Sequence, residues 1–237
     1  MAMKRIVKDL QLLEKNKQDL NNSGIFWHAD ENDLHNISLL IIPNHKCDID
    51  DQELKSPYTG GFFLFKLQIP EDFPIHPPHI EFYPKQNMCR LHPNYYENGK
   101  VCLSIINTWS TPDWTPSTSI MALANILEER LNERSVCFEP SRTMETPENI
   151  KKFNECVEYA VFKVAVLDVL LQKYADYKIF KTQIQTYWIA NKQKYIERLQ
   201  RLSQNVPLQT VRQPVYWHAF IMDYPVLLAK LSSITPS

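Results

Sequence analysis

Apolar residues recur at helical spacing near the start of the chain and predict an amphipathic helix over residues 3–20. Its apolar stripe consists of Ile6, Leu10, Leu13 and Leu20, because side chains three and four positions apart share one face of a helix. The basic residues of this segment lie mostly off that stripe, and they are Lys4, Arg5, Lys8, Lys15 and Lys17. The sequence Asn-Asn-Ser-Gly that follows is expected to end the helix.

Four runs of β-branched and aromatic residues come next, at residues 25–29, 37–42, 62–69 and 79–83. Each run is bounded by turn-forming residues, which is typical of strands. The runs succeed one another without an intervening helix, so we expect an antiparallel meander. Residues 73–78 read Phe-Pro-Ile-His-Pro-Pro and are expected to form a stiff connection, since proline cannot donate to a strand ladder.

Helical patterns dominate the second half of the chain. Thr115 and Pro116 fit the N-cap and the first position of a helix. Its expected buried face is Ile120, Leu123, Ile126 or Leu127, and Leu131. Thr146 and Pro147 repeat the same start signal after an irregular stretch, and they begin a helix that is expected to end near residue 173.

Beyond that point we expect a helix over residues 177–203, an extended segment around Pro207 and Pro214, and a short helix near residues 224–231. Many aromatic residues occupy this part of the chain, which suggests that it folds and packs. Together with the strands, the pattern predicts an α+β fold.

Composition narrows the possible functions. The 237 residues carry a net charge of −1 and a pI near 6.7, which argues against binding to nucleic acid or an anionic membrane. The chain begins without the apolar core of a signal peptide, and its most apolar run is too short to span a membrane. Five cysteines without a secretory signal indicate reduced thiols, and hence a cytoplasmic or nuclear protein.

Residues 91–104 contain the strongest candidates for catalytic side chains, and Cys102 stands eight residues after Asn94 there. Pro93 and Gly99 rule out a regular helix or a long strand here. We therefore expect Asn94 and Cys102 on two limbs of a compact loop, where the amide could stabilise an oxyanion beside the thiol. Taken alone, the spacing is equally compatible with a buried structural cysteine and an asparagine in a turn.

Three motifs carry a resemblance to a known family. They are His92-Pro93-Asn94 followed by Cys102, the strand and proline-rich loop of residues 58–78, and Asp113-Trp114-Thr-Pro-Ser117. In this order they resemble the ubiquitin-conjugating enzymes, which carry ubiquitin as a thioester. Residues 107–120, 153–156 and 163–166 are most similar to the large Z branch of that family. The resemblance implies the ubiquitin-conjugating fold over residues 1–173, with a helical extension packed on it over residues 174–237.

The resemblance also implies roles for individual residues. Cys102 would accept ubiquitin, or a ubiquitin-like modifier, from an activating enzyme and pass it to a substrate lysine or a ligase, while Asn94 stabilises the oxyanion. The expected supports of the loop are His92, Pro93 and Trp114. The residues expected to bind the activating enzyme or a ligase are Lys4, Arg5, Lys8, Ile75, Pro77, Pro116 and Ser117. No cofactor or metal is implied.

One acidic residue that many members of the family share has no counterpart in this sequence. Many relatives place an aspartate after the helix that follows the active-site loop, where it orients the attacking lysine. The matching stretch here offers Asn132, Glu133 and Glu139 instead, and the sequence does not choose among them. Which modifier, activating enzyme, ligase and substrates are involved also stays open, as do the role of the extension and the oligomeric state.

Three other interpretations remain. A cysteine hydrolase using Cys102 and His92 fits poorly, since such a histidine must be free to shuttle protons. A zinc site of Cys89, His92 and Cys102 lacks the paired fourth ligand of structural zinc. A catalytically inactive interaction scaffold is the third, although retention of Asn94 and Cys102 argues against it.

Overall fold

Four strands form one antiparallel sheet, in the computed structural model that describes residues 2–43, 56–109, 111–139 and 145–235. They are β1 (Ile25–Asp30), β2 (Asp33–Ile41), β3 (Phe63–Gln68) and β4 (His79–Tyr83), and they pair in the order β1-β2-β3-β4. The expected meander is confirmed, and β4 covers the residues predicted for it. The register is continuous from β2 to β4, with a single irregularity near the end of β1.

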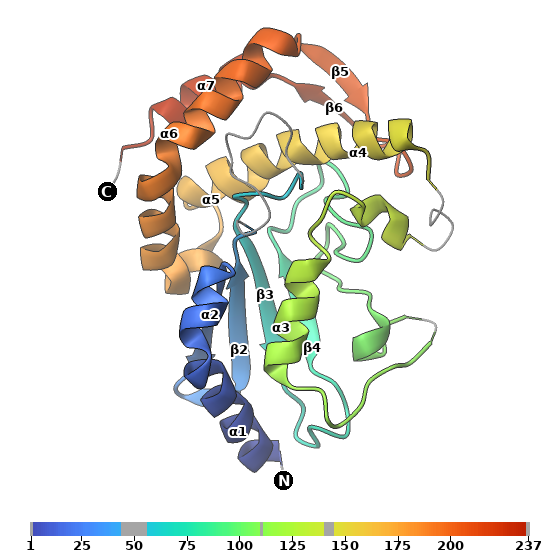
Figure 1. Ribbon diagram of the computed structural model, residues 1–237, viewed down its shortest axis with the longest axis vertical. Helices are drawn as coiled ribbons and strands as arrows, with labels where there is room; N and C mark the ends of the chain where they lie inside the picture. The colour runs from blue at the N-terminus through green and yellow to red at the C-terminus, as the bar shows by residue number, and fades with distance from the viewer. Residues whose placement is uncertain (1, 44–55, 110, 140–144, 236–237) are drawn as a thin grey trace.

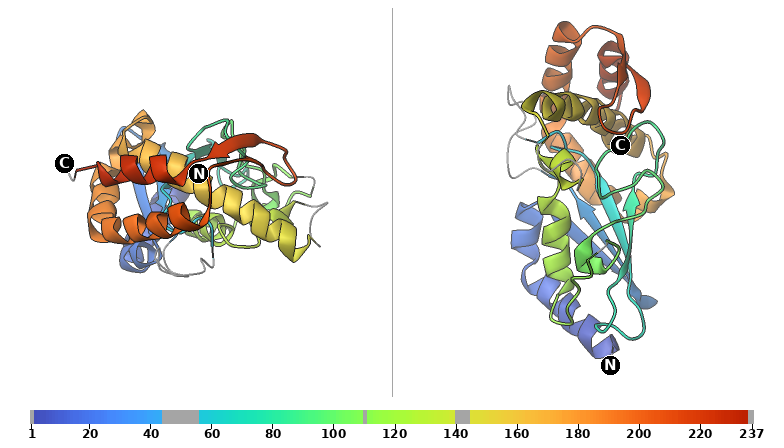
Figure 2. Two further views of the ribbon diagram at one scale, coloured as in Figure 1. Left: turned by 90° about the horizontal axis from the view of Figure 1, so that it is seen from above. Right: turned by 90° about the vertical axis from the view of Figure 1, so that its right-hand side faces the viewer.

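Two helices, α1 (Ala2–Lys15) and α2 (Lys17–Asn22), take the place of the single helix predicted over residues 3–20. The break falls at Asn16, whose side-chain amide donates to the carbonyl of Leu12 at 2.8 Å. The predicted stripe faces the core, and Ile6 and Leu13 are completely buried. Together with α3 (Ile120–Glu129), α1 covers one face of the sheet (Figures 1 and 2).

The start of α3 differs from the prediction. The helix begins at Ile120 with Ser119 as its N-cap, whose hydroxyl accepts from the Ala122 amide at 3.1 Å. The prediction of Thr115 as N-cap was wrong, because residues 115–118 instead close a turn through a bond from the Thr118 amide to the Thr115 carbonyl at 2.9 Å. The predicted buried face is otherwise present in Ile120, Leu123, Leu127 and Leu131.

The helix expected after Thr146 is confirmed as α4 (Pro147–Ala160), capped by a bond from the Asn149 amide to the Thr146 hydroxyl at 3.3 Å. It continues without a break through the π-helical segment η4 (Val161–Leu167) into the short α5 (Asp168–Leu170). The run therefore ends close to the predicted residue 173. Before it, part of the stretch expected to be irregular forms the 3-10 turn η2 (Ser135–Phe138), and residues 140–144 lie outside the described residues.

The remainder of the chain contains the 3-10 helix η5 (Ala175–Phe180), α6 (Lys181–Asn205), β5 (Gln209–Arg212), β6 (Ala219–Met222) and α7 (Tyr224–Ser232). The segment expected to be extended is thus a β-hairpin, which lies with α6 and α7 at the end of the molecule opposite α1 (Figure 1). The helix predicted near residues 224–231 is confirmed as α7.

This C-terminal part packs against the rest through buried tyrosines and one buried ion pair. Tyr177 donates its hydroxyl to the carbonyl of Phe62 at 3.0 Å, and Tyr195 donates to the carbonyl of Gly60. Arg198 on α6 meets Glu158 on α4 with nitrogen–oxygen distances of 2.7 and 2.8 Å. One hydrophobic core runs through both parts. The division into a core of residues 1–173 and an extension stays a prediction.

Among the helices of the described ranges, none has both the length and the apolar surface needed to cross a lipid bilayer.

Candidate active site

The loop that follows β4 folds back on itself and brings its two limbs together. Gly99 forms the turn with φ at +94°, and its amide donates to the carbonyl of Tyr96 at 2.9 Å. A Cβ at this position would lie 2.5 Å from the Lys85 side chain, so only glycine fits without a shift. The limbs are joined where the Cys102 amide donates to the Asn94 carbonyl at 2.9 Å. Asn94 and Cys102 thus lie on opposite limbs, as the sequence predicts.

His92 is completely buried, and both of its ring nitrogens are bonded. Nδ1 accepts from the Asn94 amide at 3.0 Å, and Nε2 donates to the carbonyl of Arg130 at 3.0 Å. Burial lowers the pKa of His92 to about 3, so the ring is neutral near pH 7. It braces the loop and has no free lone pair, which disfavours both the hydrolase and the zinc interpretation. Pro93 is buried beside it.

Asn94 is buried, and its side chain is oriented by a residue that the sequence analysis missed. Arg130, at the end of α3, donates from Nη1 to Asn94 Oδ1 at 3.2 Å. Because the carbonyl end of the amide faces Arg130, the NH2 end is the one left to donate to an oxyanion. The guanidinium of Arg130 lies over the ring of Phe138 at 4.6 Å, which fixes it in turn. No local motif marks Arg130 in the sequence.

Cys102 as a residue is only 7% exposed, and its thiol donates a hydrogen bond to the carbonyl of Thr108 at 3.0 Å. Burial raises the pKa of the thiol. Lys100 and Arg90 act in the opposite direction, and the Glu139 carboxylate adds to the rise. The thiol is therefore neutral at rest, so a reaction of this sulfur would depend on alignment rather than on a preformed thiolate.

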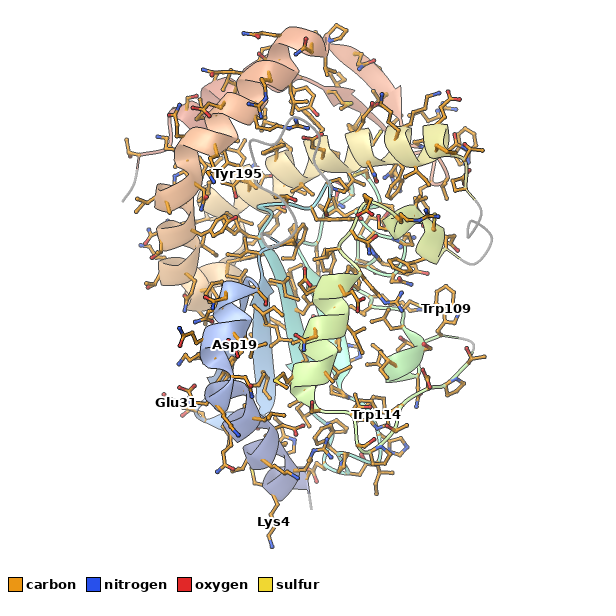
Figure 3. All side chains as sticks on the ribbon, viewed as in Figure 1. Lys4, Asp19, Glu31, Trp109, Trp114 and Tyr195 are labelled. Carbon is orange, nitrogen blue, oxygen red and sulfur yellow. The ribbon has the colours of Figure 1, made fainter. Side chains whose placement is uncertain are left out.

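The segment after the cysteine is closed by Asn107, which adopts the left-handed conformation with φ at 57°. Its Oδ1 accepts from the amides of Asp113 and Trp114 at 3.0 and 3.1 Å. The Trp114 indole donates to the carbonyl of Pro74 at 2.8 Å, so this side chain supports the proline-rich loop. Figure 3 shows Trp109 well apart from Trp114, at the edge of the molecule.

The residues expected to bind partners gather at the end of the molecule that holds the N-terminus. Lys4 points outward there (Figure 3), and Lys8 is exposed on the same helix. Ile75 is 61% exposed in the proline-rich loop, where Pro77 is half-buried. Pro116 and Ser117 are exposed in the turn before α3.

Arg5 links α1, the proline-rich loop and the turn before α3 through contacts within the chain. Its guanidinium donates to the carbonyls of Pro116 at 2.5 Å and Thr118 at 2.7 Å, and it lies over the ring of Phe73 at 5.6 Å. Its Nε also donates to Asp9 at 3.0 Å. The side chain is thus engaged within the chain, where it holds α1, the proline-rich loop and the turn before α3 in one arrangement.

Of the three candidates for the missing acid, Asn132 is used locally. Its side chain accepts from the amide of Arg134 and donates to the carbonyl of Glu129, each at 2.8 Å. Glu133 is exposed, whereas Glu139 is half-buried and accepts from the hydroxyl of Tyr216 at 2.9 Å. Only the glutamates therefore remain available to face a substrate.

Known proteins similar to this chain agree with the family resemblance of the loop. A family model described as "Ubiquitin-conjugating enzyme" matches residues 5–161. The chain is 32% identical over 236 residues to the ubiquitin-conjugating enzyme E2 Z of Danio rerio, covering 97% of this chain and 66% of that protein. It is 35% identical over 168 residues to the E2 Z of Homo sapiens, covering 70% of this chain and 44% of that protein. The chain thus spans less than two thirds of the length of these relatives.

Among solved structures, the E2 domain of a Toxoplasma gondii ubiquitin conjugating enzyme is similar with a TM-score of 0.48 and 23% identity. The match covers 70% of this chain and 99% of that one.

The meander flanked by α1 and α3, with a loop that joins an asparagine to a cysteine, places this chain in the ubiquitin-conjugating enzyme family. Within that family it belongs to the Z branch, as the motifs of residues 107–120, 153–156 and 163–166 predict.

Proposed function

We propose that this protein accepts ubiquitin or a ubiquitin-like modifier as a thioester on Cys102 and transfers it to a substrate lysine or to a ligase. The observation that carries the proposal is the junction of the two limbs of the loop, where the Cys102 amide bonds the Asn94 carbonyl. It puts an amide side chain and a thiol in one small loop, next to a neutral, fully bonded His92.

In the first step the Cys102 sulfur attacks the thioester carbonyl on an activating enzyme. A carbon–sulfur bond to Cys102 forms as the bond to the activating enzyme's cysteine breaks, and the thiol proton passes to the departing thiolate. Thiol–thioester exchange resembles thiol–disulfide exchange in that one sulfur replaces another, so alignment matters more than a strong base. The raised pKa of Cys102 is compatible with such a step.

The second step passes through a tetrahedral oxyanion. The NH2 end of Asn94 is the donor for this charge, and Arg130 holds the amide in the required orientation. Loss of one oxyanion donor costs about 100- to 1,000-fold in rate in other enzymes.

Membership of the family implies three general kinds of partner, which are an activating enzyme that uses ATP, ubiquitin ligases and protein substrates. We assign their docking to the end of the molecule formed by α1, the proline-rich loop and the turn before α3. The exposed Ile75 is the apolar anchor of that surface, and Lys4 and Lys8 are its charged part. We also propose a cytoplasmic or nuclear protein, in which free thiols such as those of Cys89 and Cys156 stay reduced.

The test is a charging reaction with activating enzymes, ATP and each modifier, read on a non-reducing gel. We expect an adduct that thiol reductant removes, that is lost in Cys102→Ala and that persists in Cys137→Ala. Cys137 is the suitable control because it is a free, partly exposed cysteine. Absence of an adduct with every activating enzyme and modifier would leave the inactive scaffold instead.

A further inference from the structure

The loop of the C-terminal hairpin lies against the segment after β4 that leads to His92 and Asn94. Between β5 and β6, Gln213 is completely buried and pairs with the backbone of Arg90. Its Nε2 donates to the Arg90 carbonyl at 2.7 Å, and its Oε1 accepts from the Arg90 amide at 2.9 Å. Arg90 precedes His92 by two residues, so this amide pair anchors the hairpin loop directly beside the residues that hold Asn94.

The same hairpin loop holds Tyr216 in place. The Arg90 guanidinium lies between two rings, at 3.8 Å from the centre of Tyr96 and 5.0 Å from that of Tyr216. Val215, just before Tyr216, adopts a φ of 73°, a conformation that β-branched residues avoid and that persists only where the surroundings enforce it. Tyr216 is therefore fixed by packing, and its hydroxyl donates to Glu139 Oε2 at 2.9 Å.

Glu139 stands at the border of the active-site loop. The residue before it, Phe138, has its ring centre 5.8 Å from that of His92 and lies under the guanidinium of Arg130. Those two residues are the ones that hold Asn94. Within the described part of the chain, Glu139 is also the carboxylate whose charge acts on the Cys102 thiol, beside Lys100 and Arg90. Glu133, by contrast, is exposed, and its carbonyl contacts Asn154 on α4.

We propose that Glu139, positioned by Tyr216 of the hairpin loop, is the catalytic carboxylate that accepts the proton of the amine attacking the Cys102 thioester. This inference rests on the proposed function. The amine nitrogen bonds the thioester carbon, the carbon–sulfur bond breaks, and Cys102 leaves as a thiolate. One ammonium proton passes to the Glu139 carboxylate and from there to the thiolate, so amide and thiol are the products.

A carboxylate in this role is needed for amine acceptors and not for thiol acceptors. An attacking thiolate carries no proton that must be removed, whereas an amine becomes positively charged as its bond forms. The segment of residues 213–218 thus belongs to the active site, although it lies about 50 residues beyond residues 5–161, which match the family model.

The test measures discharge of the preformed thioester in a single turnover, once to free lysine and once to 2-mercaptoethanol. For Glu139→Gln we expect charging at the wild-type level and an unchanged rate of discharge to the thiol. Discharge to lysine should be slowed about 100-fold. The maximal rate should fall, while the lysine concentration that gives half of it should stay the same. Glu139→Asp should recover part of the rate. Glu129→Gln, an exposed carboxylate at the end of α3, is the matched control.

Tyr216 is a positioning residue, and a double-variant cycle tests it. Tyr216→Phe keeps the ring on Arg90 but removes the hydroxyl, and should slow discharge to lysine roughly 10-fold. The double variant of Tyr216→Phe and Glu139→Gln should be no slower than Glu139→Gln alone, because both changes act through one carboxylate.

Two results would overturn the inference: wild-type lysine discharge in Glu139→Gln, or equal slowing with both acceptors. A slow Glu133→Gln beside a normal Glu139→Gln would assign the role to Glu133. Failure of the wild-type protein to charge would instead refute the proposed function, so the two failures are distinguishable.

Discussion

The buried ion pair between Glu158 and Arg198 gives the sharpest prediction about stability. Both side chains are nearly buried, and they join α4 to α6. Replacing Arg198 with methionine keeps most of the side-chain volume but leaves the Glu158 carboxylate without this partner. Removing one member of a buried pair costs about 3–5 kcal/mol. For a chain of this size that corresponds to a fall in melting temperature of about 6–20 °C.

The loss should depend on pH. Burial raises the pKa of Glu158 even in the presence of Arg198, which opposes the rise. Without Arg198 the folded-state pKa rises further above that of the unfolded chain, so protonation favours the folded state. The deficit of Arg198→Met is therefore full above the folded-state pKa of Glu158 and shrinks as the pH falls through it.

Chemical unfolding followed by circular dichroism at pH 7.5 and 5.5 measures both effects. The double variant Glu158→Leu/Arg198→Met is the control, because an apolar pair of similar volume removes the unpaired charge and should restore most of the stability. A loss below about 1 kcal/mol in Arg198→Met at pH 7.5 would refute the reasoning, since a buried pair costs more than an exposed one. So would a deficit that grows as the pH falls.

Three further predictions concern the loop and the N-terminal end. Arg130→Met keeps the backbone carbonyl that His92 bonds but frees Asn94, so thioester discharge should fall roughly 10-fold, and an unchanged rate would contradict the role of Arg130. Arg5→Ala should lower the free energy of unfolding by about 1.5–3 kcal/mol in urea titrations, against at most about 0.5 kcal/mol for the exposed Lys8→Ala; equal losses would argue that Arg5 does not hold α1, the proline-rich loop and the turn before α3 together. Because the folded-state pKa of His92 is about 3, its ring signals in NMR spectra should stay unchanged from pH 7 to 5, and its contribution to stability should be lost as the pH falls from about 6.5 towards 3; a shift of those signals at pH 5 would show a protonated ring.

Local patterns were enough to predict the sheet and the central part of the site. β4 matches its predicted residues because a short alternation of polar and apolar residues with a proline on each side has few alternatives. Asn94 and Cys102 could be paired because Gly99 turns the chain between them. Both results depend on residues within a short stretch of sequence.

What the sequence did not reveal depends on distant contacts. The sequence predicted Thr115 as the N-cap of α3, whereas Ser119 caps the helix in the structure. Arg5, more than 100 residues earlier, binds the carbonyls of the turn between them. Arg130 reaches Asn94 from another element, and Gln213 meets Arg90 from 123 positions away. Such partners cannot be read from spacing, since nothing local distinguishes them from exposed polar residues.

The π-helical segment η4 has a consequence for how the sequence can change over time. It lies between the sheet side of the molecule and the C-terminal helices, and six of its seven residues are buried. Val161 would come within 2.8 Å of any Cβ at Gly61, and Phe162 meets the ring of Tyr195 with centres 6.0 Å apart. Close packing makes each volume change here felt by a neighbour. We therefore expect residues 61, 162 and 195 to covary among related sequences, although more than 130 positions separate the first from the last.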